Sequence, residues 1–352
     1  MINRTSGVPL YLQLADKIRD EIKSGKIIPG EKLMSENEMA NYYRIGRLTI
    51  REALSVLVNE GLLAKQHGKG TFCIAVPSAQ KRLKFDIILD MTDVYFIPYY
   101  LQSICSVFED KQCEIVINDT KNDIKTINSL LEDIAAKGSD GVILQPCPTL
   151  CGNSDETAHA FDTLIRSDIP YIMLDGVYEN VVPSYVILDE REVGRLAAQY
   201  FLSCGHKNLC VIHNNKYRDS KKRTDGFAEK LNAPPLLIDC CDDLKTRLPG
   251  MIALHPEITG IFCYNDLVAK ECMEILADNN ISVPDEISVI SVDDTVIAST
   301  VTPPLTSIVH PKEKLGEAAA AALYEICTSG AEWPYKKIFT PELAVRRSVK
   351  KL

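Results

Sequence analysis

The chain has 352 residues, of which 46% are hydrophobic and 25% are charged, and its formal net charge at pH 7 is −9. This composition is typical of a globular protein with two or three folding units, and no apolar run approaches the roughly 20 residues of a membrane span. The N-terminal stretch lacks an apolar segment followed by a small-residue cleavage site, so we expect a cytoplasmic protein with no membrane partner. The twelve cysteines form no Cys-x-x-Cys pair, which predicts free thiols and no bound metal.

The charge is distributed unevenly along the chain. Residues 1 to 84 hold 14 Lys and Arg against 8 Asp and Glu, a net of +6, which leaves −15 for the remainder. A basic segment favours a polyanionic partner, although solvated surfaces often carry such an excess. The pattern of helices in this segment must therefore decide between a polyanion-binding surface and an ordinary solvated one.

Two helices are expected at the start of the basic segment. Apolar residues recur every four positions between Val8 and Ser24, which predicts an amphipathic helix that ends at Gly25. Ser35 followed by Glu38 has the spacing of a capping box, so a short second helix should cover about residues 35 to 42.

A third helix should begin near Arg47 and end before Gly61. Arg47 and Arg51 then lie about 40° apart around it, in its first turns. Two strand-like runs follow, LLAKQH and TFCIAV, joined by the turn Gly68-Lys69-Gly70. Three helices and a two-stranded ribbon make a winged helix-turn-helix, whose third helix enters the major groove of DNA. Arginine suits both guanine edges and phosphate.

The first 75 residues resemble the DNA-binding domain of the GntR family from Pro9 to Cys73. Family members usually read Leu-Pro-Ser-Glu where this chain has LMSE, and Val-Ser-Arg-x-Thr-Val-Arg where it has IGRLTIR. Gly46 replaces the family's serine, which would cap the helix and bind a phosphate. The resemblance implies contacts with double-stranded DNA from six residues: Glu36, Arg47, Thr49, Arg51, Lys69 and Gly70.

A polar, basic stretch over residues 76–83 predicts a linker. Beyond it, over residues 84–352, apolar strand-like runs alternate with helical stretches. This alternation occurs twice, in two similar halves. Such alternation predicts an α/β fold with two parallel sheets, each covered by helices on both faces. Ligands of open α/β sheets bind beyond the carboxyl ends of the strands, so we expect a cleft between the two halves.

Polar residues follow the predicted strands at that edge. Each is often a helix cap or a turn residue, a role we assign to Asp266 and Asp294. Together they suit a neutral polyhydroxylated ligand, with Tyr95, Phe96 and Tyr178 to cover its apolar faces, and Arg223 is expected to open a helix nearby. The residues at the strand ends are Asp90, Asp93, Gln145, Asp175, His213, Asn265, Asp266, Asp293 and Asp294.

The large domain resembles the sensor domain of the LacI/GalR family, which shares the fold of periplasmic sugar-binding proteins. The strings IFCYNDLVAKECMEIL, VPDEISVISVDD and PPLTSIVHPKEKLGEAAAA carry the resemblance. It implies two lobes, the first over about residues 84–187 and 310–338 and the second over about 188–309 and 339–352. The implied effector contacts are Arg223, Asn265, Asp293, His310, Tyr95, Phe96, Gln145 and Tyr178.

The two resemblances form an uncommon combination, which is similar to the arabinose-operon repressors of Gram-positive bacteria. It implies a homodimeric repressor of sugar-utilisation genes, released from its DNA operator by a small sugar, with L-arabinose as the expected effector. Gln145 stands where that group would have an acidic residue. A different sugar or an activating role stays open. An enzyme fused to a GntR domain is the alternative of another class, but the chain has no Gly-x-Ser-x-Gly, P-loop or His-Glu-x-x-His motif. We therefore expect no enzyme activity and no cofactor.

Overall fold

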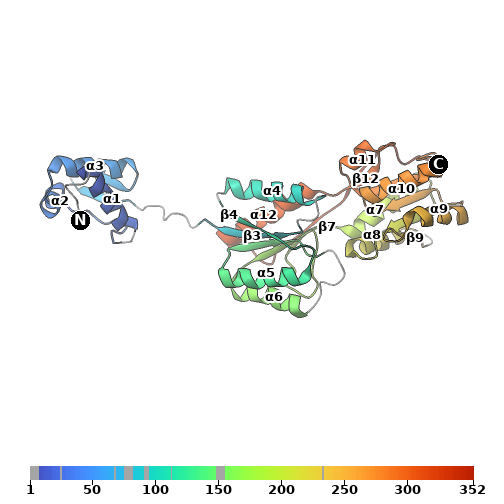
Figure 1. Ribbon diagram of the computed structural model, residues 1–352, viewed down its shortest axis with the longest axis horizontal. Coiled ribbons are helices and arrows are strands. Elements are labelled where there is room, and N and C mark those ends of the chain that lie inside the picture. Colours follow the sequence, from blue (N-terminus) through green and yellow to red (C-terminus); the bar gives the residue numbers. More distant parts are fainter. Residues whose placement is uncertain are drawn as a thin grey trace. The chain divides into compact units, whose positions relative to one another are not determined.

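Two compact units, Met1–Arg82 and Leu83–Leu352, make up the chain in the computed structural model (Figure 1). Most of the predicted linker lies outside the described residues, as do Asp93 and Gly68. The structure describes residues 8–23, 26–66, 69–74, 82–90, 95–111, 113–147, 155–231 and 234–352.

The first unit is a winged helix-turn-helix, as predicted. Its apolar stripes meet in one core, in which Leu14, Ile18, Ile50 and Leu54 are almost fully buried. β1 and β2 pair in antiparallel register to form the wing. The elements are α1 (Leu10–Lys23), α2 (Glu36–Tyr43), α3 (Arg47–Asn59), β1 (Leu63–Gln66) and β2 (Gly70–Cys73).

The turn between α2 and α3 follows from local chemistry. The predicted capping box is confirmed: Ser35 Oγ accepts from the Glu38 N–H at 3.3 Å, and Glu38 Oε2 accepts from the Ser35 N–H at 2.7 Å. Arg44 ends α2 in the left-handed conformation, with φ 53°. Gly46 is the N-cap of α3 and offers no side-chain hydrogen bond to it.

Lobe 1 of the second unit is built on a six-stranded, fully parallel sheet with the order β13-β7-β6-β5-β3-β4. Helices α4 and α12 cover one face, and α5 and α6 cover the other (Figure 1). Its elements are β3 (Lys84–Leu89), α4 (Ile97–Asp110), β4 (Glu114–Asp119), α5 (Ile124–Lys137), β5 (Gly141–Leu144), α6 (Asp155–Arg166), β6 (Tyr171–Leu174), β7 (Tyr185–Leu188), α12 (Lys312–Ser329) and β13 (Lys336–Phe339).

Lobe 2 has a second six-stranded sheet with the order β14-β12-β11-β10-β8-β9, in which only the edge strand β14 is antiparallel to its neighbour. Helices α7 and α8 pack on one face, and α9 to α11 on the other. Its elements are α7 (Glu190–Ser203), β8 (Leu209–His213), α8 (Arg218–Ala228), β9 (Leu236–Asp239), α9 (Leu244–Leu254), β10 (Gly260–Cys263), α10 (Asp266–Asp278), β11 (Ser288–Asp293), α11 (Val296–Thr300), β12 (Thr306–Val309) and β14 (Glu342–Ala344).

Three segments of chain cross between the lobes. They join β7 to α7, β12 to α12, and β13 to β14. The predicted α/β architecture with two sheets is therefore confirmed. None of the described helices is both long enough and apolar enough to cross a bilayer.

Two details differ from the prediction. Arg223 does not open a helix, because α8 begins five residues earlier, at Arg218. The run RDSKKR carries no apolar stripe to mark that start, and Tyr217 provides no capping side chain. Helix α9 was not expected, since Pro249 lies inside it and interrupts the helical pattern.

Candidate functional site

The first turn of α3 presents an exposed surface. Arg47 and Arg51 are exposed and Thr49 is half-buried, whereas Ile50, on the apolar stripe that the arginines flank, is fully buried in the core. The apolar stripe thus fixes the helix on the unit and leaves its polar residues free to meet a partner. Leu48, which the sequence reasoning missed, is 70% exposed between Arg47 and Thr49. In the sequence, only the position of Leu48 in the first turn of the third helix could have indicated a contact with a partner.

Glu36 holds Arg51 in place. The guanidinium of Arg51 donates to the Glu36 carboxylate at 2.9 Å, and Lys65 Nζ lies 3.5 Å from the same group. This bond to Arg51 lowers the pKa of Glu36. The carboxylate is therefore occupied by cations of the protein, and it fixes the position of the Arg51 guanidinium.

The wing adds further positive charge. Lys69 and Gly70 are exposed, and Gly70 has φ 124°, a conformation that side chains rarely adopt. Lys32, Lys65 and Lys69 border a surface hollow of about 540 Å³ between the wing and α2. Three lysines against one carboxylate, that of Glu36, give the hollow a net positive charge, which favours a polyanion as its occupant.

A second group of candidate residues lies where the two lobes meet. Asp175, just after β6, accepts hydrogen bonds from the Tyr100 hydroxyl at 2.7 Å and from His310 Nε2 at 2.9 Å. His310 lies in the crossing segment after β12 and is 2% exposed. Burial lowers the pKa of its imidazole, but the Asp175 carboxylate outweighs burial, so the net pKa is raised.

Arg223 is the central cation of this group. Its guanidinium donates to both carboxylate oxygens of Glu190, at 2.5 and 3.0 Å, and to the Tyr264 carbonyl at 2.8 Å. Its Nη2 also lies 4.0 Å from Asp293 Oδ1. Glu190, the first residue of α7, was not predicted, because its acidic surroundings in the sequence are typical of any helix start.

Asp293 ends β11 with φ 106° and is 1% exposed. Lys312 Nζ donates to its backbone carbonyl at 2.5 Å and so holds this unusual backbone conformation. Burial raises the pKa of the Asp293 carboxyl to about 7, against the opposing effect of Arg223. Among the residues that the structure describes, Asp293 Oδ1 and His310 Nδ1 are buried atoms without a hydrogen-bond partner. Buried polar atoms are normally satisfied, so both are open to a ligand.

Three other predicted effector residues surround this group. Asn265 caps α10 with its side-chain oxygen at 2.9 Å from the Val268 N–H, which leaves its amide nitrogen for other partners. The Tyr95 hydroxyl donates to Thr295 Oγ1 across the lobes at 3.2 Å. The Phe96 ring lies 4.9 Å from the His310 ring.

Gln145 and Tyr178 lie on the lobe 1 side. Gln145 follows β5, and its side-chain oxygen accepts weakly from the Asp90 N–H at 3.4 Å. Tyr178 is fully buried in the core of lobe 1, and its hydroxyl accepts from the Cys147 N–H at 2.8 Å. Tyr178 therefore ties two loops of lobe 1 together, and its contact with an effector stays a prediction.

The two aspartates assigned to structural roles are engaged within lobe 2. The buried Asp266 carboxylate accepts from Ser291 and Ser307 at 2.5 and 2.8 Å, and also from Thr295. Asp294 forms an ion pair with Arg346 at 2.6 Å. None of these contacts involves Arg223, so Asp266 and Asp294 keep the structural roles assigned to them.

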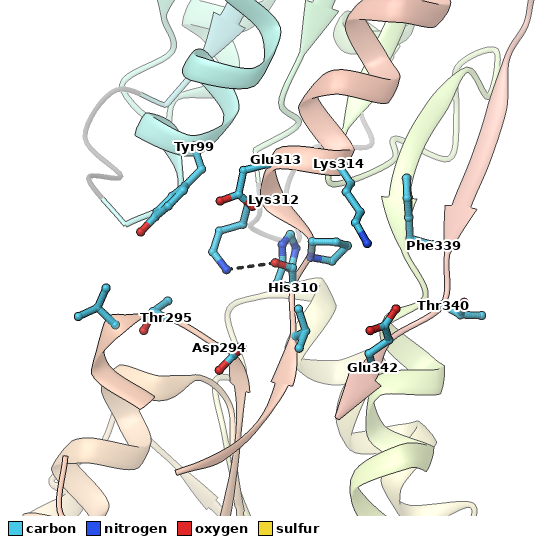
Figure 2. A pocket seen from close by; sticks show the side chains of 13 residues that line it. Tyr99, Asp294, Thr295, His310, Lys312, Glu313, Lys314, Phe339, Thr340 and Glu342 are labelled. Atoms are coloured by element: carbon cyan, nitrogen blue, oxygen red, sulfur yellow. Dashed lines mark hydrogen bonds between the residues drawn. The ribbon is translucent and has the colours of Figure 1, made fainter. Parts of the chain in front are cut away.

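A cavity of about 290 Å³ lies between the crossing segments on the side of Tyr99 and Phe339 (Figure 2). Figure 2 shows His310 and Lys312 behind it, and Asp294 and Glu342 at its lower edge. Of the predicted effector residues, only His310 lines it. The cavity adjoins the Arg223 cluster through His310 and through Lys312, which donates to the Asp293 carbonyl.

A metal is not required to explain the buried carboxylates. Ligand atoms of Asp175, Glu190 and His310 lie within 4.8 Å of one another, a spacing compatible with a metal ion. Asp175 and Glu190, however, already accept hydrogen bonds from Tyr100 and Arg223. The cluster is internally compensated by the cations of the protein.

Comparison with known proteins identifies both units. The family of bacterial regulatory proteins named gntR matches residues 10–73, and the periplasmic binding protein-like domain matches residues 198–349. The arabinose metabolism transcriptional repressor of Halalkalibacterium halodurans is 28% identical over 96% of this chain and 96% of its own length. The transcriptional repressor PurR of Vibrio parahaemolyticus is 31% identical over 62% of this chain and 67% of its own length.

Solved structures share the fold. A complex of the transcriptional regulator CelR with cellobiose has a TM-score of 0.64 at 18% identity, covering 90% of this chain and 100% of that chain. A LacI family regulator from Enterococcus faecalis V583 with bound ribose has a TM-score of 0.65 at 23% identity, covering 76% of this chain and 99% of that chain. The chain therefore belongs to the transcriptional regulators that join a GntR-family DNA-binding domain to a periplasmic-binding-protein-like domain of the LacI/GalR type.

Proposed function

We propose that the protein is a homodimeric repressor of sugar-utilisation genes, and that L-arabinose releases it from its operator by binding between the lobes. The observation that carries this proposal is that the buried atoms Asp293 Oδ1 and His310 Nδ1 have no hydrogen bond to any described residue. A hydroxyl group both donates and accepts hydrogen bonds, so neighbouring hydroxyls of one sugar can satisfy a carboxylate oxygen and an imidazole nitrogen together. A buried polar atom without a partner costs roughly 1–3 kcal/mol, and binding would recover that free energy.

The relatives support a sugar effector. The arabinose repressors of Halalkalibacterium halodurans and Geobacillus stearothermophilus match nearly the whole chain. They favour repression and L-arabinose over the alternatives of an activator or another sugar. In the proposed site, Arg223, Asn265, Asp293 and His310 bind hydroxyls, joined by Gln145 from lobe 1, and Tyr95 and Phe96 cover an apolar face.

The proposed DNA contacts follow from the exposed turn of α3 and the wing. Arg47 and Arg51 read base edges, while Thr49, Lys69 and Gly70 contact phosphates. Leu48 packs against a thymine methyl group, which is the apolar contact that the major groove offers. In a dimer, two such helices would enter successive major grooves of a near-palindromic operator.

Release requires that the sugar bind the DNA-incompetent state more tightly than the DNA-bound state. A coupling free energy of about 1–3 kcal/mol between two such sites is typical. The sugar would supply it by joining groups from both lobes, so that the bound ligand adds to the stability of the closed arrangement.

The test is DNA retention measured against a panel of pentoses and hexoses. Duplexes that the full-length protein selects from a random pool serve as the operator, and retention is titrated with each sugar at two salt concentrations. We expect L-arabinose to release the DNA, and binding to weaken steeply between about 50 and 200 mM salt because phosphate contacts dominate.

Other results would redirect the proposal. Release by a different sugar would replace the effector and keep the mechanism, and stronger retention with sugar would indicate an activator. If no sugar changes retention, or if retention is insensitive to salt, the proposal is wrong.

A further inference from the structure

Arg218 belongs to lobe 2 but makes its contacts with lobe 1. It is the first residue of α8, and its Nη1 and Nη2 donate to the backbone carbonyls of Val177 and Cys147, at 2.5 and 3.0 Å. Its guanidinium also lies 5.5 Å from the centre of the Tyr178 ring. Guanidinium is the side chain best suited to such a contact, since its planar fork can serve two acceptors and an aromatic face together.

The two loops that Arg218 contacts are tied to each other. Tyr178 Oη accepts the Cys147 N–H at 2.8 Å, so the loop after β5 and the loop after β6 form one bonded group. These loops carry Gln145 and Asp175, which lie two residues before Cys147 and Val177. Arg218 therefore attaches to the part of lobe 1 that presents polar side chains to the lobe interface.

The other end of this connection is Arg223, five residues further along α8 and about 7.5 Å along its axis. Helix α8 has no freedom to slide on α7, because the two backbones touch. A Cβ atom on Gly194 of α7 would meet the Arg223 carbonyl oxygen, and one on Gly226 of α8 would meet the Arg191 carbonyl oxygen, both at 1.9 Å. The helix is thus a rigid link between the Arg223 cluster and the loops of lobe 1.

We propose that Arg218 is a positioning residue that holds the two lobes closed and thereby sets the affinity for the effector. The carbonyls of Val177 and Cys147 can reach Arg218 only when the lobes lie together. Its hydrogen bonds therefore form on closure and favour the arrangement in which Gln145 and Asp175 stand near Arg223. The link to effector affinity rests on the proposed sugar-binding function, whereas the link to lobe closure does not.

The test compares Arg218→Met with Lys221→Met in the full-length protein. Arg218→Met keeps the apolar stem and removes both donors, while Lys221 is exposed on the same helix and serves as the matched control. Hydrogen exchange of residues 141–147 and 171–178, and the radius of gyration from small-angle scattering, are measured without sugar. Sugar affinity is measured by calorimetry with L-arabinose and the panel of sugars.

We expect Arg218→Met to speed exchange in both segments, to increase the radius of gyration, and to weaken sugar binding by about 10- to 100-fold, the range for hydrogen bonds from a charged donor. Affinity for DNA without sugar should not fall, because opening the lobes disfavours the released state. Arg218→Lys should fall between Met and the wild type, since an ammonium can hold only part of the fork's contacts.

Exchange and scattering equal to the wild type in Arg218→Met would overturn the inference. Unchanged sugar affinity in a variant with open lobes would remove its link to sensing. If the wild-type protein binds no sugar at all, the proposed function fails, and the exchange and scattering data still decide whether Arg218 holds the lobes. If Arg218→Met does not fold, the same comparison is made with Arg218→Lys.

Discussion

The two units use arginine in opposite ways. In the first unit, the side chain of Arg51 is 55% exposed and pairs with Glu36 at the surface. In the second, the side chain of Arg223 is 7% exposed and pairs with a Glu190 that is equally buried. Exposed pairs contribute little to stability, whereas a buried pair cannot lose one partner without leaving the other charge uncompensated. Substitution of Arg51 should therefore change DNA binding and leave stability almost unchanged. Substitution of Arg223 should change both sugar binding and stability.

The largest effect is expected for Arg223→Ala. The substitution leaves Glu190 and Asp293 without their cation, so it should abolish release of DNA by sugar and destabilise the second unit by about 3–5 kcal/mol. DNA affinity without sugar should be retained, because the first unit has its own core. Retention assays with and without sugar, combined with thermal unfolding, check both parts.

Lys221→Ala is the control for Arg223→Ala, since Lys221 is exposed on the same helix. It should respond to sugar and unfold like the wild type. Loss of DNA binding together with the sugar response in Arg223→Ala would assign Arg223 to folding and not to sensing.

The next effect is expected for Arg51→Ala in the first unit. Loss of a base contact typically costs about 1–3 kcal/mol, so DNA affinity should fall by roughly 5- to 150-fold. The thermal stability should stay within about 0.5 kcal/mol of the wild type, because the pair with Glu36 is exposed. Equilibrium binding to the selected duplex and thermal unfolding measure the two quantities.

Glu36→Gln tests whether Glu36 acts by orienting Arg51 or by contacting the DNA directly. The amide still accepts a hydrogen bond from Arg51 but removes the negative charge, so we expect a smaller loss of specificity than for Arg51→Ala. Equal affinities of Arg51→Ala and the wild type would show that this arginine does not read the DNA.

A pH dependence of sugar binding follows from Asp293. Burial raises its carboxyl pKa from 3.8 to about 7, so the carboxylate that accepts a sugar hydroxyl is lost as pH falls through 7. Sugar affinity should therefore decrease by about fivefold between pH 7 and pH 6. The titratable groups that act on Asp293 are Arg223, His310, Asp266 and Lys312.

Stability without sugar should show the opposite trend. A carboxyl with a raised pKa takes up a proton on folding between pH 4 and pH 7, so its contribution is most favourable at low pH and is lost as pH rises through 7. The raised pKa of His310 acts in the same direction. Calorimetry and thermal unfolding at pH 6, 7 and 8 test both trends.

Asp293→Asn should flatten the pH profile of sugar binding. A second variant is needed because another buried carboxyl, that of Asp219, could titrate in the same range. Burial also raises the pKa of Asp219 to about 7. Asp219→Asn should retain the decrease in sugar affinity below pH 7. If it removes that decrease while Asp293→Asn keeps it, the titrating group is Asp219.

The sequence predicted the first unit more completely than the second, for a physical reason. A capping box, an apolar period and a turn involve neighbours a few residues apart, so they are visible in the sequence. Contacts of the interlobe cluster join distant positions: His310 and Asp175 are 135 residues apart, and Arg218 and Val177 are 41 apart. Alternating strands and helices could predict the two sheets, but not which charges meet between them. Glu190, Lys312 and Arg218 were missed for this reason.

The smallest effect is expected where this chain departs from its family at an exposed position of the first unit. Gly46 caps α3 with φ −63° and ψ 145°, a conformation open to any residue, and a Cβ atom there would come no closer than 4.0 Å to Thr49 Oγ1. A serine therefore fits without strain. Its hydroxyl can accept a backbone N–H of the first turn, which is worth a few tenths of a kcal/mol over glycine, and can also donate to a phosphate.

Gly46→Ser should thus bind DNA about two- to twelvefold more tightly, since one hydrogen bond contributes about 0.5–1.5 kcal/mol. Gly46→Ala adds the same Cβ without the hydroxyl and serves as the matched control. Tighter binding by both variants would trace the gain to a stiffer backbone. Tighter binding by serine alone would show that the wild-type protein lacks one phosphate contact. Equal binding by all three proteins would mean that a backbone N–H of α3 already makes it.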